Sequence, residues 1–158
     1  MFEGLNHIII AGTKYPIKCD LYVLERIQDE YGSLETFEEG IRYRKQADGM
    51  VPKLDENEQP VLDENNNPAM VPGKVWKYKD PDMKMINHGL ELMINEGIDI
   101  ENEESRERIP HVTARGLSRK MDLSVFEVSD ALQREYVTCF KVKNRQTTQS
   151  QNPENQNR

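Results

Sequence analysis

Residues 5–32, LNHIIIAGTKYPIKCDLYVLERIQDEYG, decide the fold because their hydrophobic period changes at Asp20. Before Asp20, β-branched and aromatic residues alternate with polar ones on either side of a glycine-containing turn, which is typical of a hairpin. After Asp20, apolar residues recur every three or four positions, which is typical of an amphipathic helix. We therefore expect a β-hairpin over Leu5–Cys19 that leads directly into a capped helix over Asp20–Gly32.

The two elements make specific predictions about burial. In the second strand Tyr15, Ile17 and Cys19 share one face and should be buried, whereas Pro16 falls on the opposite, solvent-facing side. Proline cannot donate a ladder hydrogen bond, so this strand is expected at a sheet edge. The helix is expected to bury a stripe that comprises Leu21, Leu24, Ile27 and Tyr31.

Further capped helices follow along the chain. Ser33 should cap a short helix, and Asp80 with Pro81 should open a longer one that ends at Gly97. Thr113 is a second candidate N-cap, and Ser124 with Glu127 has the spacing of a capping box. A hairpin followed by packed helices predicts an α+β fold, with a single domain over residues 1–143.

Two segments depart from this pattern. Residues 44–79 contain the repeat LDENEQPV and LDENNNPA, two acidic turns that each end in proline, so we expect a long flexible insertion. Asp63 opens a partial calcium-loop motif, but Pro68 and Lys74 replace the glycine and the glutamate that such a loop requires. Residues 144–158 are rich in Gln and Asn without periodicity, and we expect a disordered polar tail.

Composition excludes several function classes. The net charge of −7 argues against a dedicated nucleic-acid binder, which needs a positive footprint. No apolar run approaches the ~20 residues of a membrane span, so a soluble protein inside the cell is expected. Cys19 and Cys139 lie outside any CxxC spacing and are interpreted as two reduced thiols, with a disulfide or metal pair as the alternative.

No catalytic or metal-binding motif is evident. His7, His88 and His111 fall on a strand, a helix and a loop, without the spacing of a zinc site. There is neither a nucleophile elbow nor a phosphate-binding glycine loop. The glutamates within 101–107 alternate with arginines, as on a solvated helix face. We expect a protein that is not an enzyme and that binds no cofactor or metal.

A basic cluster supports one alternative. Six positive or titratable side chains fall within fifteen residues, and the segment Thr113–Lys120 followed by the Ser124-capped helix loosely resembles a helix-turn-helix. A prophage-encoded DNA-binding regulator is therefore the second candidate class. The presumed recognition helix, however, carries Glu127, Asp130 and Glu135, with Arg134 as its only base-reading candidate. The cluster comprises Arg106, Arg108, His111, Arg115, Arg119 and Lys120.

Several stretches together resemble a known family. They are the hairpin IIIAGTKYPI at 8–17, the helix that ends in YGSL at 31–34, LMINEGIDI at 92–100, and CFKVK at 139–143. In this order they look like the tail assembly chaperones of long-tailed (siphovirus-type) phages and prophages of Gram-positive bacteria. The resemblance covers roughly residues 5–143, and its motifs are structural.

The resemblance implies a function. Such chaperones bind the tape-measure protein, keep it soluble and promote tail-tube assembly around it. They act in the host cell cytoplasm, are absent from the mature virion, and use no nucleic acid or membrane. Contact with the tail-tube protein and self-association are also expected. A small structural tail or connector protein is a further alternative. The hypothesised partner-binding residues are Met83, Ile86, Leu90, Met93, Tyr136 and Phe140.

Overall fold

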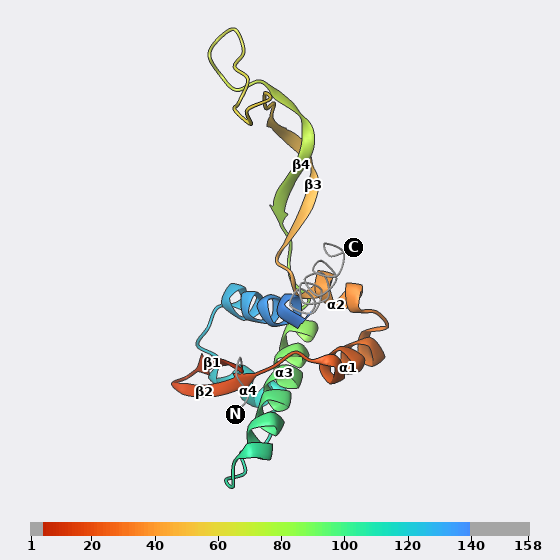
Figure 1. The fold of residues 1–158 in the computed structure, drawn as a ribbon, viewed down its shortest axis with the longest axis vertical. Helices are drawn as coiled ribbons and strands as arrows, with labels where there is room; N and C mark the ends of the chain where they lie inside the picture. Colours follow the sequence, from red (N-terminus) through yellow and green to blue (C-terminus); the bar gives the residue numbers. More distant parts are fainter. Residues whose placement is uncertain (1–4, 140–158) are drawn as a thin grey trace, which may run out of the picture. The chain divides into compact units, whose positions relative to one another are not determined.

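The computed structural model describes residues 5–139 and has an α+β architecture (Figure 1). The chain divides into two compact units. One unit contains the N-terminal hairpin and the helices, and the other is Tyr43–Asp80. The second unit spans nearly the same residues as the insertion that was expected at 44–79 within a single domain. The predicted tail at 144–158 and Phe140 lie outside the described residues.

The N-terminal hairpin forms as predicted. Strands β1 (Asn6–Ile10) and β2 (Thr13–Ile17) pair antiparallel, and Ala11 and Gly12 make the turn with φ of +50° and +80°. Two residues with positive φ match the right-handed twist of the strands. Tyr15, Ile17 and Cys19 are buried, as predicted. The prediction of a solvent-facing Pro16 was wrong, because its backbone lies against a helix glycine, Gly97.

Helices α1 (Leu21–Tyr31) and α2 (Leu34–Ile41) begin at the predicted caps. The Asp20 carboxylate accepts from the Val23 amide at 3.0 Å, and the Ser33 hydroxyl accepts from the Thr36 amide at 3.1 Å. Leu24 and Ile27 are buried as expected, but Leu21 is exposed. Val23 is buried in its place, so the buried stripe of α1 is rotated from the predicted one.

Helix α3 (Met83–Glu104) differs from the prediction at both ends. Asp82, not Asp80, is its N-cap and accepts from two amides of the first turn. The helix also continues through Gly97 instead of ending there. Gly97 permits close packing: a Cβ at this position would stand 2.6 Å from the carbonyl carbon of Pro16. The glycine therefore serves the approach of β2 to α3 and not a helix stop.

The last two helices follow their predicted caps. Thr113 caps α4 (Ala114–Lys120), and residues 125–139 are helical. The Ser124 hydroxyl accepts from the Glu127 amide at 3.1 Å, while the Glu127 carboxylate accepts from the Ser124 amide at 2.8 Å. This reciprocal pair is a capping box. We refer to residues 125–139 as the C-terminal helix.

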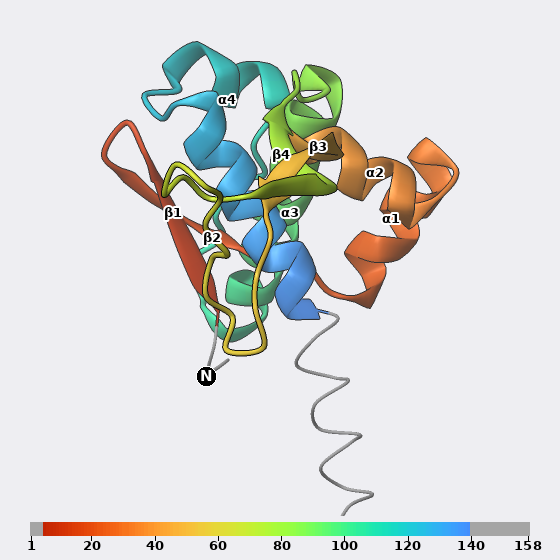
Figure 2. The same cartoon turned by 90° about the horizontal axis from the view of Figure 1, so that it is seen from above.

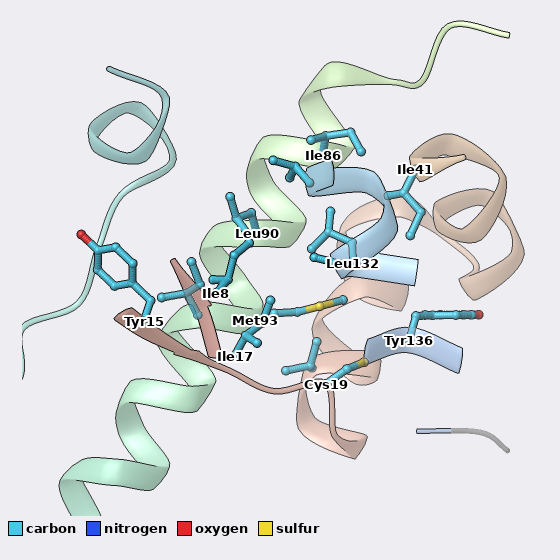
Figure 3. Close-up of a cluster of buried hydrophobic side chains, with 14 of the residues drawn as sticks. Ile8, Tyr15, Ile17, Cys19, Ile41, Ile86, Leu90, Met93, Leu132 and Tyr136 are labelled. Carbon is cyan, nitrogen blue, oxygen red and sulfur yellow. The ribbon is translucent and has the colours of Figure 1, made fainter. Parts of the chain in front are cut away.

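The core of the first unit lies around α3, which contacts β2, α1, α2 and α4. Figure 2 gives a second view of these elements, and Figure 3 shows side chains from α3, the N-terminal hairpin and the C-terminal helix converging on this core. Phe37, Met93 and Leu132 have no exposed surface. The buried Ser129 hydroxyl donates to the Ile41 carbonyl and so ties the C-terminal helix to α2.

The second unit, which contains the insertion predicted at 44–79, is built on a hairpin. Strands β3 (Arg44–Pro52) and β4 (Met70–Tyr78) form a regular antiparallel ladder with Gly49 opposite Gly73. A Cβ on Gly49 would meet the Val75 side chain at 2.7 Å, so the valine occupies the space above the glycine. The alternating pattern was hidden in the sequence by the glycines and prolines in both strands.

The eight-residue repeat forms the tip of this hairpin. Lys53, Val61 and Ala69, which are spaced by eight residues, are joined in a closed ring of backbone hydrogen bonds of 2.7–2.8 Å. Each eight-residue repeat forms a turn whose two ends belong to this ring. Equivalent residues Glu58 and Asn66 have φ of +60° and +63°. The predicted pair of exposed turns is thus present. The ring of hydrogen bonds joins the two turns to the ends of β3 and β4.

Candidate functional site

Most of the hypothesised partner-binding residues are in the core. Ile86, Leu90 and Met93 of α3 are at most 2% exposed, and Tyr136 of the C-terminal helix is 5% exposed. With so little exposed surface they cannot form a binding face by themselves, so their assignment as the partner-binding face was wrong. The reason is that α3 is covered by both the hairpin and the C-terminal helix, which its 3.6-residue period alone does not reveal. Met83, in contrast, is 45% exposed.

Met83 borders an apolar groove between α3, α4 and the C-terminal helix. The groove has a volume of about 240 Å³. Small-molecule pockets typically measure about 300–1,000 Å³, so this groove suits single side chains of a partner better than an enclosed ligand. The lining residues are Met83, Ile86, Asn87, Ser118, Met121, Leu123, Val125 and Val128.

Local structure explains why this groove stays open. Helix α4 ends at Lys120, and the capping box begins the next helix at Ser124, so Met121 and Leu123 lie on the short link between them. Val125 follows directly and is 38% exposed. Neither Leu123 nor Val125 was among the partner-binding residues hypothesised from the sequence. The sequence signal for this surface was a group of apolar residues, among them Leu123 and Val125, next to a helix start. A link that is fully exposed to solvent would be expected to be polar there.

A second groove, of about 340 Å³, lies between α1 and α3 and is polar. Two histidine–carboxylate pairs border it: His88 with Glu30 at 3.0 Å, and His111 with Asp99 at 2.6 Å. A third carboxylate, Glu91, accepts from the Ala114 amide at 2.5 Å. These acidic groups therefore already have partners within the chain, and their contacts join α1, α3 and the start of α4.

Glu96 is the most perturbed carboxyl along this groove. The pKa of Glu96 is raised to about 7, chiefly by burial and also by the like charges of the nearby Asp20 and Asp99 carboxyls. A hydrogen bond with Asp20 acts in the same direction. Asp20 also caps α1, so Glu96 couples the start of α1 to the middle of α3.

The other groups considered in the sequence are dispersed. His7 pairs with Glu101 at 3.2 Å, far along the chain from the other two histidines. Within residues 5–139, no cluster of three His, Cys, Asp or Glu side chains could hold a metal ion. In the partial calcium loop, the Asp63 carboxylate accepts from the amides of Asn65 and Asn67 at 2.9 and 3.0 Å. The Asp63 carboxylate thus stabilises the turn through these two hydrogen bonds.

The basic cluster does not form one uniform surface. Arg115 and Arg119 are exposed on α4. Lys120, however, donates to the Tyr15 hydroxyl and lies over that ring, 4.9 Å from its centroid, so it fastens α4 to β2. On the C-terminal helix, the exposed positions include the acidic residues Glu127 and Asp130. A phosphate backbone would meet both signs of charge here.

The two cysteines are closer in the fold than in the sequence. Both are free thiols; Cys19 is buried and Cys139 is partly buried. Burial raises the pKa of the Cys19 thiol, and the neighbouring Cys139, which is also its hydrogen-bond partner, raises it further. A buried thiol with a raised pKa is a weak nucleophile.

Comparisons with protein-family models, curated proteins and solved structures gave no match for this chain. Among the helices in the described part of the chain, none is both long and apolar enough to cross a membrane.

Proposed function

We propose that this protein is a tail assembly chaperone of a long-tailed phage or prophage of a Gram-positive bacterium. It binds the tape-measure protein, keeps it soluble and promotes assembly of the tail tube around it. The observation that carries the proposal is the apolar groove beside Met83, Met121 and Val125. The sequence resemblance given above supplies the identity of the partner.

The groove suits a helical partner. A tape-measure protein is a long, helix-rich chain whose apolar stripe aggregates until the tube encloses it. An amphipathic helix binds a groove by inserting apolar side chains at intervals of three or four residues. Met83 and Met121 give this groove adaptable walls, because methionine is unbranched and polarisable. Phe126, 46% exposed, adds apolar surface one residue beyond Val125.

Charge supports the second part of the role. The chain has a net charge of −7, so many copies bound along one tape-measure chain would repel other such complexes and keep them in solution. Each copy contributes only a small groove, so single contacts are weak. Tail-tube subunits can then displace the chaperone as the tube grows.

Co-expression with the tape-measure protein of the same genome tests the proposal. We expect soluble tape-measure protein that co-purifies with several copies of the chain. Met83→Glu with Val125→Glu should abolish this effect by placing charges at the groove. Leu21→Glu with Ile109→Glu, two exposed apolar residues outside it, should not. A tape-measure protein that stays insoluble beside folded wild-type chain contradicts the proposal, and binding of duplex DNA at low salt would favour the regulator instead.

A further inference from the structure

The β3–β4 ladder directs its backbone groups in a pattern that can be assigned residue by residue. Just beyond one end of the ladder, the Lys79 amide donates to the Tyr43 carbonyl at 3.0 Å. Just beyond the other end, the Lys53 amide donates to the Ala69 carbonyl at 2.7 Å. Because bonded and non-bonded pairs alternate in an antiparallel ladder, the odd-numbered residues of β3 bond to β4 and the even-numbered residues direct N–H and C=O outward. The outward residues of β3 are Arg44, Gln46, Asp48, Met50 and Pro52.

The outer edge of β3 is open to another strand. Every outward residue from Arg44 to Met50 has an amide hydrogen and is exposed, and proline occurs only at the last position, Pro52. The register skips no position, so no bulge interrupts the strand. On β4, by contrast, Pro72 interrupts the outer edge because it cannot donate. Among the residues that the structure describes, β3 pairs only with β4.

An open edge of this kind fits an extended chain. Unpaired N–H and C=O groups along a strand are a template for another strand, and proteins usually cover or interrupt them. A two-stranded sheet is also only marginally stable in water, so a third strand would stabilise the hairpin. In such strand addition, main-chain hydrogen bonds supply affinity and alternating side chains supply specificity. The side chains beside this edge therefore indicate the sequence of the partner.

One face of the ladder is positively charged near the base of the hairpin. Lys45 and Lys77 are direct cross-strand partners and are both exposed, an arrangement of like charges that is unfavourable by itself. Neither lysine forms an ion pair with any residue in the described part of the chain. A carboxylate from a neighbouring strand, placed beside Lys45, would relieve this repulsion.

The opposite face is apolar, and its charges already have partners. Met50 is 52% exposed and Trp76 is 55% exposed. The Arg44 guanidinium lies over the Trp76 ring, 5.2 Å from its centroid. Asp48 forms an ion pair with Lys74 at 2.5 Å. This face therefore favours apolar side chains from a neighbouring strand.

We propose that the outer edge of β3 binds an extended segment of a partner protein as a third strand, and that acidic and apolar residues alternate in this segment. Its acidic side chains lie on the face of Lys45 and Lys77, and its apolar side chains lie on the face of Met50. The hairpin belongs to a different unit from the apolar groove, so this contact is additional to the one in the proposed function.

A synthetic peptide in which glutamate and valine alternate, nine residues long like β3, is the probe. Hydrogen exchange of the full chain, followed by NMR, locates its binding site. With the peptide, the amides of Gln46, Asp48 and Met50 should exchange at least about tenfold more slowly, because they become hydrogen-bonded. The outward amides of Lys74 and Trp76 on β4 should not change. A peptide that fails to bind, or that binds without slowing the β3 amides, overturns the proposal.

Methylated peptides test the strand geometry. Only alternate amides of an added strand face its neighbour. One peptide is therefore N-methylated at its odd positions and a second at its even positions. One of the two should bind like the parent peptide, and the other at least about tenfold more weakly. Equal affinities of the two methylated peptides would exclude pairing along an edge.

Protein variants test the edge and its charge separately. Gln46→Pro removes an outward amide without removing a hydrogen bond of the ladder, and should weaken binding at least about tenfold. Met70→Pro, at an outward position of β4, is the matched control and should bind normally. Lys45→Glu/Lys77→Glu should lose the glutamate peptide and bind its lysine–valine counterpart instead. Trp76 emission and circular dichroism establish folding, and a folded Gln46→Pro variant that binds like wild type contradicts the proposal.

Two other occupants of the edge are distinguished by the same exchange measurement. Protection of the Gln46 and Asp48 amides that rises with protein concentration, without peptide, would assign the edge to a second copy. Protection by single-stranded oligothymidine but not by the peptide would assign it to a nucleic acid. Either result overturns the proposal. None of these measurements involves the tape-measure protein, so the outcome is independent of the proposed function.

Discussion

A Cβ atom on Gly97 would stand 2.6 Å from the carbonyl carbon of Pro16, so α3 and β2 meet backbone to backbone. A hydrogen bond of 3.0 Å from the Lys18 amide to the Met93 carbonyl continues the same contact. This junction joins the N-terminal hairpin to the central helix. It also explains why Pro16, which has no amide to donate, is tolerated and buried.

Gly97→Ala should destabilise the protein by about 2–3 kcal/mol, because neither backbone can move away without disturbing the core. Gly40→Ala is the matched control. The atom closest to a new Cβ there is the Met85 sulfur, at the flexible end of a side chain. Alanine also favours the helix by up to ~1 kcal/mol. Chemical denaturation measures both, and equal losses for the two variants would contradict the backbone contact.

Met93→Ala should lower the free energy of unfolding by about 2–5 kcal/mol, because Met93 has no exposed surface and its removal leaves a cavity. Met83→Ala, on the exposed start of the same helix, should change it by no more than ~0.5 kcal/mol. Thermal and urea denaturation of the two variants compare them directly. A small effect at Met93 would restore it as a candidate surface residue.

Stability should depend on pH through Glu96. The pKa of Glu96 is about 7 in the folded chain, against an ordinary value of 4.5 for the unfolded chain. Between these two pH values the folded chain therefore binds more protons than the unfolded chain. The stability from this site is complete below about pH 4.5 and is lost as pH rises through 7. Glu96→Gln, which cannot ionise, should be more stable than wild type at about pH 8.

We expect a gain of about 1 kcal/mol for Glu96→Gln at that pH, a value reduced for solvent screening because the side chain is partly exposed. The gain should largely disappear at about pH 5. Melting temperatures of both proteins across this range measure it. A gain of the same size at both pH values would show that the carboxyl has an ordinary pKa.

The two thiols should differ in reactivity. In the native chain Cys19 should react with a thiol reagent such as DTNB far more slowly than Cys139, because burial both blocks access and raises its pKa. Unfolding in guanidinium should make both react rapidly. Cys139→Ser isolates the signal of Cys19. Rapid native labelling of that variant would contradict the buried position.

Local signals in the sequence determined the elements with clear periodicity and caps. The hairpin at 5–19, the caps Ser33 and Thr113, and the capping box at Ser124 all formed where they were predicted. A cap is decided by a side chain and amides two or three residues away, so short-range sequence contains the information. The same holds for the repeat, whose two turns each satisfy their own amides.

Only the tertiary structure decided the roles that depend on what packs against a residue. The sequence could not distinguish Gly97 as a close contact from Gly97 as a helix stop, because the strand that touches it lies some eighty residues earlier. Likewise, the α3 stripe was buried and Met83 exposed because two distant elements cover one part of the helix and not the other. Burial of a helix face is a property of its neighbours, and the chain order alone does not specify them.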